Sequence, residues 1–249
     1  MRARWLTLFL DFPGGDFERG VAFWQEVTGS GLSARRGPDG EFATLLPPDG
    51  DAYLRVQRVH DGPGGCHLDC HVDLAETSLD DAAAEAAGLG GTVRYREEGE
   101  VVVVESPGGF AFCFVPWDGE TTVPRPGEDT SRASQLTLDI PPDDFDRETA
   151  FWAKLTGWGL QPGPVPDFTF LGKPPEMPVG LLFQRRNQAA PGDRVTGHID
   201  IACGDQARVI ARHKAAGARV RGEHPSWTVM TDPVNRPYCL CRVDVCVCE

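Results

Sequence analysis

Residues 16–32 read DFERGVAFWQEVTGSGL, and the same pattern returns at residues 144–160 as DFDRETAFWAKLTGWGL. Apolar side chains such as Phe17, Val21 and Trp24 follow helical spacing, which predicts one helix with a buried stripe. An aspartate precedes each run, where its carboxylate can cap the helix, and a Thr-Gly pair ends it. Because a repeat of this length places both copies in equivalent structural units, it decides the architecture of the chain.

Around these two helices, the same order of predicted strands and helix occurs four times along the chain. Each half has a strand before the repeated helix and further strands after it, and then begins again with a second strand and helix. The strands expected in the first half are 6–12, 42–46, 53–59, 67–74, 93–96, 100–105 and 110–115, with a second helix at 80–87. Those expected in the second half are 135–140, 168–171, 179–185, 198–202, around 220, 228–230 and 238–243, with a second helix at 206–216. The sequence therefore predicts an α+β fold of four βαβββ units, paired into two domains with curved mixed sheets, helices on the convex face and a concave cup opposite.

One stretch between the two halves has the composition of a linker. It contains Gly119, Pro124, Pro126 and Gly127 among polar residues. We therefore expect a first domain at 1–118, a linker at 119–134 and a second domain at 135–249.

The composition excludes several classes of partner. The 249 residues are 41% hydrophobic and carry a formal net charge of −13, which disfavours nucleic acid and anionic membranes. No stretch has the roughly 20 apolar residues of a membrane span. The apolar run 5–10 resembles a signal peptide weakly, but its counterpart 136–140 lies in mid-chain, so both are interpreted as strands. The expected location is the cytoplasm.

Four of the eight cysteines lie close together near the end of the chain, at Cys239, Cys241, Cys246 and Cys248. A Cys-x-Cys spacing differs from the usual Cys-x-x-Cys of a zinc site, and alternate strand residues share one face. We expect reduced strand cysteines, while a metal site or a disulfide remains the alternative.

Strand alternation predicts which side chains face the cup. The triplet His-x-Asp occurs at the same place in both halves, as His67 with Asp69 and as His198 with Asp200. Such a pair can bind a ligand, or it can be a structural pair that the duplication copied. The candidate ligand-binding residues are Thr7, Phe9, Asp11, His67, Asp69, Cys113, Thr137, Asp139 and Trp158.

With these motifs, the chain resembles the vicinal oxygen chelate superfamily, which includes glyoxalase I, extradiol dioxygenases and bleomycin-resistance proteins. The Ala-Phe-Trp helix, the His-Leu-Asp strand and the Asp-Pro turn at residue 232 carry the resemblance over nearly the whole chain. The closest likeness is to its glyoxalase-like branch, whose members are often tandem.

The resemblance implies a divalent metal held by residues at set positions of each domain. Those positions are Thr7, Arg55, His67 and Cys113 in the first domain, and Gln135, Leu182, His198 and Cys239 in the second. Neither set contains a carboxylate, and Arg55 would repel a cation, so a degenerate metal site is expected. The remaining candidate metal ligands are Gln135, His198 and Cys239, for zinc, nickel, manganese or iron.

Two functions follow from this resemblance. The first is binding of a small organic molecule in the cup without a metal. The alternative is a metal-dependent lyase, isomerase or dioxygenase acting on a vicinal-oxygen substrate, with His198 as a ligand and Asp200 as the residue that orients it or as a base. A third interpretation is metal-free general acid–base catalysis with His198 and Asp200 as the catalytic residues. Because two domains in one chain can pair with each other, either a monomer or a homodimer is expected.

Overall fold

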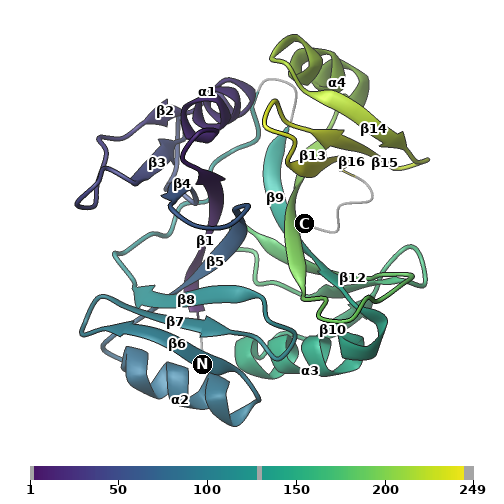
Figure 1. The fold of residues 1–249 in the computed structure, drawn as a ribbon. Coiled ribbons are helices and arrows are strands. Elements are labelled where there is room, and N and C mark those ends of the chain that lie inside the picture. Colours follow the sequence, from purple (N-terminus) through teal and green to yellow (C-terminus); the bar gives the residue numbers. More distant parts are fainter. Residues whose placement is uncertain (1–2, 128–130, 244–249) are drawn as a thin grey trace. The chain divides into compact units, whose positions relative to one another are not determined.

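The computed structural model describes residues 3–127 and 131–243, which form two eight-stranded mixed sheets with α-helices (Figure 1). The strand order is β2-β3-β4-β1-β5-β8-β7-β6 in the first sheet and β10-β11-β12-β9-β13-β16-β15-β14 in the second. The predicted α+β class and the four repeated units are therefore confirmed.

The elements follow the predicted order, with two short strands and a 3-10 turn in addition. The first sequence repeat contains β1 (Ala3–Pro13), α1 (Phe17–Thr28), β2 (Gly31–Leu32), β3 (Phe42–Leu46), β4 (Leu54–Val59), β5 (Gly65–Val72), α2 (Leu79–Gly88), β6 (Thr92–Glu97), β7 (Val101–Glu105) and β8 (Ala111–Pro116). The second contains β9 (Arg132–Ile140), a 3-10 turn (Pro142–Asp144), α3 (Phe145–Thr156), β10 (Leu160–Pro162), β11 (Phe168–Leu171), β12 (Gly180–Arg185), β13 (Thr196–Cys203), α4 (Gln206–Ala215), β14 (Arg219–Glu223), β15 (Trp227–Thr231) and β16 (Pro237–Arg242). No helix in the described ranges is long and apolar enough to cross a membrane.

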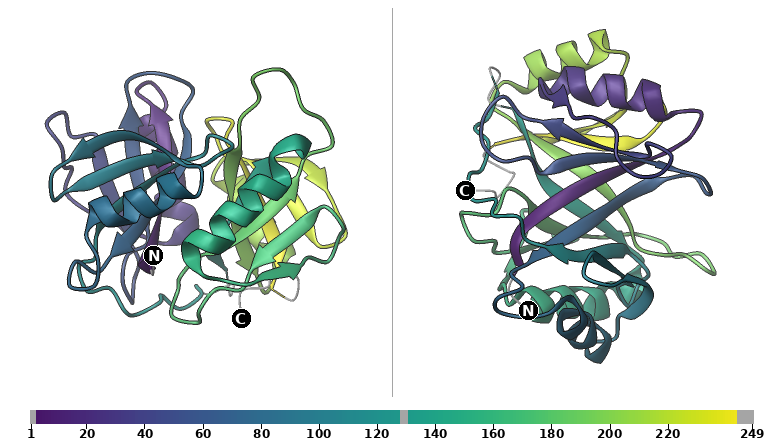
Figure 2. Two further views of the ribbon diagram at one scale, coloured as in Figure 1. Left: turned by 90° about the horizontal axis from the view of Figure 1, so that it is seen from below. Right: turned by 90° about the vertical axis from the view of Figure 1, so that its left-hand side faces the viewer.

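The chain folds into two compact units that each combine segments from both repeats. Within the described residues, one unit contains 3–8, 67–121 and 137–197, and the other contains 9–66, 122–127, 131–136 and 198–243. Each unit thus includes one helix with the Ala-Phe-Trp motif and one helix of the second kind. Helices α2 and α3 belong to the same unit. In the left view of Figure 2 they lie in front of the strands that they contact, which are β6, β7 and β8 for α2 and β12 for α3.

The Ala-Phe-Trp helices supply the aromatic core of each unit. In one unit the rings of Trp152 and Phe112 lie 4.9 Å apart, so α3 covers strand β8 of the other repeat. In the other unit Trp24 of α1 lies 5.4 Å from Tyr238 of β16. The helical stripe predicted from the sequence is buried in both copies, but it packs on a strand from the opposite repeat.

Each repeated helix ends as predicted but begins differently. Gly29 and Gly157 adopt left-handed conformations at the two C-termini, which glycine tolerates without steric cost. The predicted aspartate caps are wrong, because the carboxylates of Asp16 and Asp144 accept no backbone N–H of the helix. Both residues have helical backbone angles, and their side chains pair with the arginines three residues later.

One glycine of α1 is required by packing. A Cβ added at Gly20 would lie 2.3 Å from Cε1 of Phe12, whose ring is fully buried. Alanine favours a helix over glycine by about 1 kcal/mol, whereas overpacking a rigid core costs about 1–3 kcal/mol. Because these two effects oppose each other, we expect Gly20→Ala to lower the free energy of unfolding by up to about 2 kcal/mol, measured by urea denaturation.

Gly88 provides the matched control for this substitution. It is an exposed residue of α2, and a Cβ there would meet no atom within 4 Å. Gly88→Ala should therefore be neutral or slightly stabilising. A Gly20→Ala protein at least as stable as the parent would show that the Phe12 ring moves aside.

Candidate metal centres

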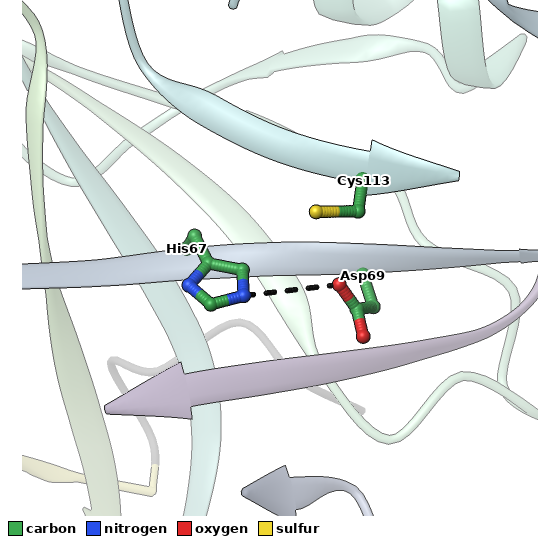
Figure 3. Close-up of side chains that lie close together, drawn as sticks. All are labelled: His67, Asp69 and Cys113. Carbon is green, nitrogen blue, oxygen red and sulfur yellow. Dashed lines mark ion pairs between the residues drawn. The ribbon is translucent and has the colours of Figure 1, made fainter. Parts of the chain in front are cut away.

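The first cluster lies on two parallel strands. His67 and Asp69 come from β5, and Cys113 comes from β8, where its Cα is the register partner of Asp69. One donor atom from each residue lies within 4.8 Å of the others. His67 Nε2 is 3.9 Å from Asp69 Oδ1, and Figure 3 shows the thiol on the same side of β5. Parallel pairing therefore assembles three donors from two distant parts of the sequence.

The second cluster repeats this arrangement in the second sheet. His198 and Asp200 lie on β13, and the Cα of Cys239 on β16 is paired with that of Asp200. His198 Nε2 is 3.4 Å from Asp200 Oδ1 and 3.6 Å from Cys239 Sγ. The three donor atoms again lie within 4.8 Å of one another. Both copies of the predicted His-x-Asp pair are thus joined by a cysteine.

The donor atoms of the second cluster are arranged differently from those of a Cys-His-Asp relay. In a relay, the thiol and the carboxylate face opposite nitrogens of the imidazole. Here Asp200 Oδ1 and Cys239 Sγ both approach Nε2 of His198. Three donors of different chemistry therefore point at one small region. The side chains of His198 and Asp200 are 11% and 3% exposed, so this region is largely shielded from water.

The donor set fits a divalent ion of intermediate softness. Imidazole, carboxylate and thiolate are all ligands of zinc, and the same sites bind other first-row metals. A carboxylate and a thiolate together offset the charge of a divalent cation. Asp69 and Asp200 supply the carboxylate that the family positions did not include, because each lies two residues after the histidine on the same strand face.

Glutamine and threonine at the equivalent positions of β9 and β1 have different partners. Gln135 donates its side-chain N–H to Oδ2 of Asp200 at 2.7 Å, which leaves Oδ1 toward the histidine. Thr7 instead shares a 2.9 Å hydrogen bond with His71 Nε2. The other ring nitrogen of His71 lies 3.6 Å from Glu120, a residue inside the predicted linker. The composition of that linker did not indicate that one of its residues lies beside a buried histidine.

The other predicted ligand-binding residues lie in several environments. Phe9 is buried and makes an edge-to-face contact with Phe42. Asp11 lies near the guanidinium of the half-buried Arg236. Thr137, Asp139 and Trp158 are respectively buried in β9, half-buried in β9, and half-buried just after α3. Their part in ligand binding stays a prediction.

None of the described cysteines forms a disulfide: Cys66, Cys70, Cys113, Cys203, Cys239 and Cys241. Cys239 and Cys241 are buried and share one face of β16, as predicted from alternation. Cys246 and Cys248 lie outside the described residues. Burial raises the pKa of Cys70 well above its ordinary value, so that thiol stays protonated at neutral pH.

Four βαβββ units in two sequence repeats, with a donor cluster on each sheet, define a tandem protein of the vicinal oxygen chelate type. The chain belongs to the glyoxalase-like domain family, whose model matches residues 7–115 and 135–241. A search of curated proteins found no significant match.

Solved structures of low sequence identity share this fold. The 2,2',3-trihydroxybiphenyl 1,2-dioxygenase of Sphingomonas wittichii strain RW1 is 17% identical with a TM-score of 0.63, over 95% of this chain and 89% of that chain. The Mn(II)-bound glyoxalase of Novosphingobium aromaticivorans is also 17% identical with a TM-score of 0.63, over 97% and 82% of the chains. The 2,3-dioxygenase LapB of Pseudomonas sp. KL28 is 13% identical with a TM-score of 0.66, over 97% and 91%.

Proposed function

We propose that this chain binds a divalent metal ion at His198, Asp200 and Cys239 and presents it to a small organic molecule with neighbouring oxygen atoms. The observation that carries the proposal is the approach of a carboxylate oxygen and a thiol sulfur to the same imidazole nitrogen. The equivalent cluster in the other half is a second site of the same kind. The Mn(II)-bound glyoxalase of the same fold supports a metal-dependent activity.

The chain's own residues would hold and orient the ion. Gln135 donates to one oxygen of Asp200, which keeps the other oxygen directed toward His198. A bound divalent ion would act as a Lewis acid that polarises a substrate oxygen. His198 is half-buried, whereas Asp200 and Cys239 are buried, so a ligand would approach the cluster from the side of the histidine.

Metal analysis of tag-free protein tests the proposal. After dialysis against zinc, cobalt, nickel, manganese or iron and removal of excess ion, we expect up to two equivalents of at least one metal per chain. His198→Ala and His67→Ala should each remove one equivalent, because each removes one of three ligands. The control His224→Ala, at an exposed residue stacked on Trp227, should retain the parent's metal content. Binding of no metal, or equal loss in all three variants, would contradict the proposal.

Cobalt spectroscopy tests the role of the thiol separately. The cobalt-loaded protein should show a thiolate-to-metal charge-transfer band that Cys239→Ser and Cys113→Ser each weaken and that the double variant removes. Cys241→Ser is the matched control, because Cys241 is buried two residues further along the same face of β16. A band that survives in Cys239→Ser together with Cys113→Ser would exclude both thiols as ligands.

Metal-free binding of a small molecule is the second candidate function. It is favoured by an apolar group beside Cys239, formed by Ala202, Cys241, Trp227 and Val229. Such a surface can hold an apolar ligand without a metal. Ligand binding that persists unchanged after chelation would select this candidate.

A further inference from the structure

Two arginines and two phenylalanines gather on one face of β1, β3 and β4. Arg55 is the cross-strand partner of Thr44, so their side chains share a face. Arg36 is hydrogen-bonded through its backbone to Phe42 in both directions, and its guanidinium donates to Thr44 Oγ1 at 2.9 Å. Both guanidinium groups therefore lie over the same few residues.

This face is the one without a helix. The residues that alternate with the cluster, Ala43, Leu45, Leu54 and Val56, are buried on the opposite face, and α1 contacts β4. On the helix-free face, Phe9 meets Phe42 with ring centroids 6.4 Å apart. The Arg55 guanidinium lies 5.8 Å from the centre of the Phe9 ring. Positive charge and aromatic surface are thus adjacent.

The electrostatics of the cluster favour an anion. The hydrogen-bond acceptors of the Arg36 guanidinium among the described residues are the hydroxyls of Ser33 and Thr44, which carry no charge. Partial burial and the neighbouring charge of Arg55 lower the pKa of Arg36. Two cations held close together repel each other, and a bound anion removes that repulsion.

The second repeat shows that the fold itself does not require an arginine at the position of Arg55. In β11 and β12, the paired positions that correspond to Thr44 and Arg55 are occupied by Phe170 and Leu182. The same strands therefore pair with apolar residues at these places. An arginine that lies beside Arg36 in only one repeat adds repulsion between two positive charges. Its presence therefore indicates a role in recognising a ligand.

We infer that Arg36 and Arg55, together with Phe9 and Phe42, bind a small aromatic carboxylate on the helix-free face of β3 and β4. Arginine matches a carboxylate with two parallel N–H donors, and the phenyl rings provide surface for the apolar part. The inference names the ligand class for the proposed small-molecule binding and rests on that part of the proposal, not on the metal.

Calorimetric titration with benzoate and phenylacetate tests the inference against their neutral analogues, benzamide and phenylacetamide, and against acetate. The carboxylates with a ring should bind at least tenfold more tightly than either the amides or acetate. Equal binding of acids and amides would overturn the role of charge, and equal binding of acetate would overturn the role of the rings. Failure of both aromatic acids to bind would overturn the inference as a whole.

Variants then assign the binding to these residues. Arg36→Gln and Arg55→Gln should each weaken benzoate binding at least tenfold. Arg35→Gln is the matched control, because Arg35 adjoins Arg36 in sequence but stacks 4.4 Å above the Phe17 ring of α1. It should change the affinity less than twofold, and an Arg35→Gln effect equal to that of Arg36→Gln would contradict the assignment.

The comparison of acid and amide on the parent protein needs no variant, so it stands even if a variant fails to fold. Repeating the titrations on chelated protein separates this inference from the metal. Benzoate binding to the chelated protein would uphold the inference even if metal analysis overturns the metal proposal.

Discussion

Glu148→Ala will lower the free energy of unfolding by about 3–5 kcal/mol, because it leaves two buried N–H groups without acceptors at about 1–3 kcal/mol each, in addition to lost packing. Glu148 is fully buried in α3. Its Oε1 accepts from the Trp152 indole at 2.9 Å, and its Oε2 accepts from the backbone N–H of Gly108 at 2.8 Å. The carboxylate thereby ties α3 to the turn before β8. Urea denaturation of parent and variant measures the change.

Two further variants make this prediction specific. Glu148→Gln keeps the shape but has a single acceptor oxygen, so it should lose roughly half as much stability as Glu148→Ala. Glu26→Ala, at an exposed position of α1, should change the free energy of unfolding by less than about 0.5 kcal/mol. A loss below about 1 kcal/mol for Glu148→Ala would mean that water satisfies both donors.

In the other unit, a tryptophan of the repeated helix also donates to a carboxylate, but this carboxylate comes from the turn and not from the helix. The Trp24 indole donates to Oδ2 of Asp232 at 3.2 Å, and Asp232 lies in the turn before β16. In the sequence repeat, Gly20 stands where α3 has Glu148, and Ser106 stands where the other turn has Asp232. Each unit therefore contains one carboxylate between its repeated helix and a turn, supplied by the helix in one unit and by the turn in the other.

Acidification will weaken the fold through His213, by up to about 1.4 kcal/mol for each pH unit below 6.5. The residue is fully buried in α4, with Nδ1 2.8 Å from the Tyr238 hydroxyl and its ring 6.0 Å from that of Phe23. Burial, aided by the charge of Arg212, lowers the pKa of His213 to about 3. Because the unfolded chain binds a proton near pH 6.5 and the folded chain does not, stability is fully present above that pH and falls toward pH 3.

Comparing the parent with a His213 variant separates the contribution of His213 from those of the other titratable groups. His213→Leu should make the unfolding free energy less dependent on pH between 6.5 and 4, although it lowers stability at pH 7 by removing the partner of Tyr238. Equal slopes for the parent and His213→Leu would show that His213 is protonated within the fold.

The sequence by itself determined the repeated units and most of their elements. Helical spacing, strand alternation and terminal glycines are local properties of the chain, so Trp24, Trp152, Gly29 and Gly157 already indicated buried stripes and helix ends. The shared face of Cys239 and Cys241 followed from alternation alone.

Only the tertiary structure decided which of these residues meet. The parallel register that pairs Asp69 with Cys113, and Asp200 with Cys239, joins strands separated by a helix and two further strands. The contacts of the Ala-Phe-Trp helices with strands of the opposite repeat likewise depend on how the units assemble. The alternation of residues along a strand predicts which face of the sheet a side chain occupies. Its neighbour on that face depends on the register between strands that are distant in sequence, which no local pattern encodes.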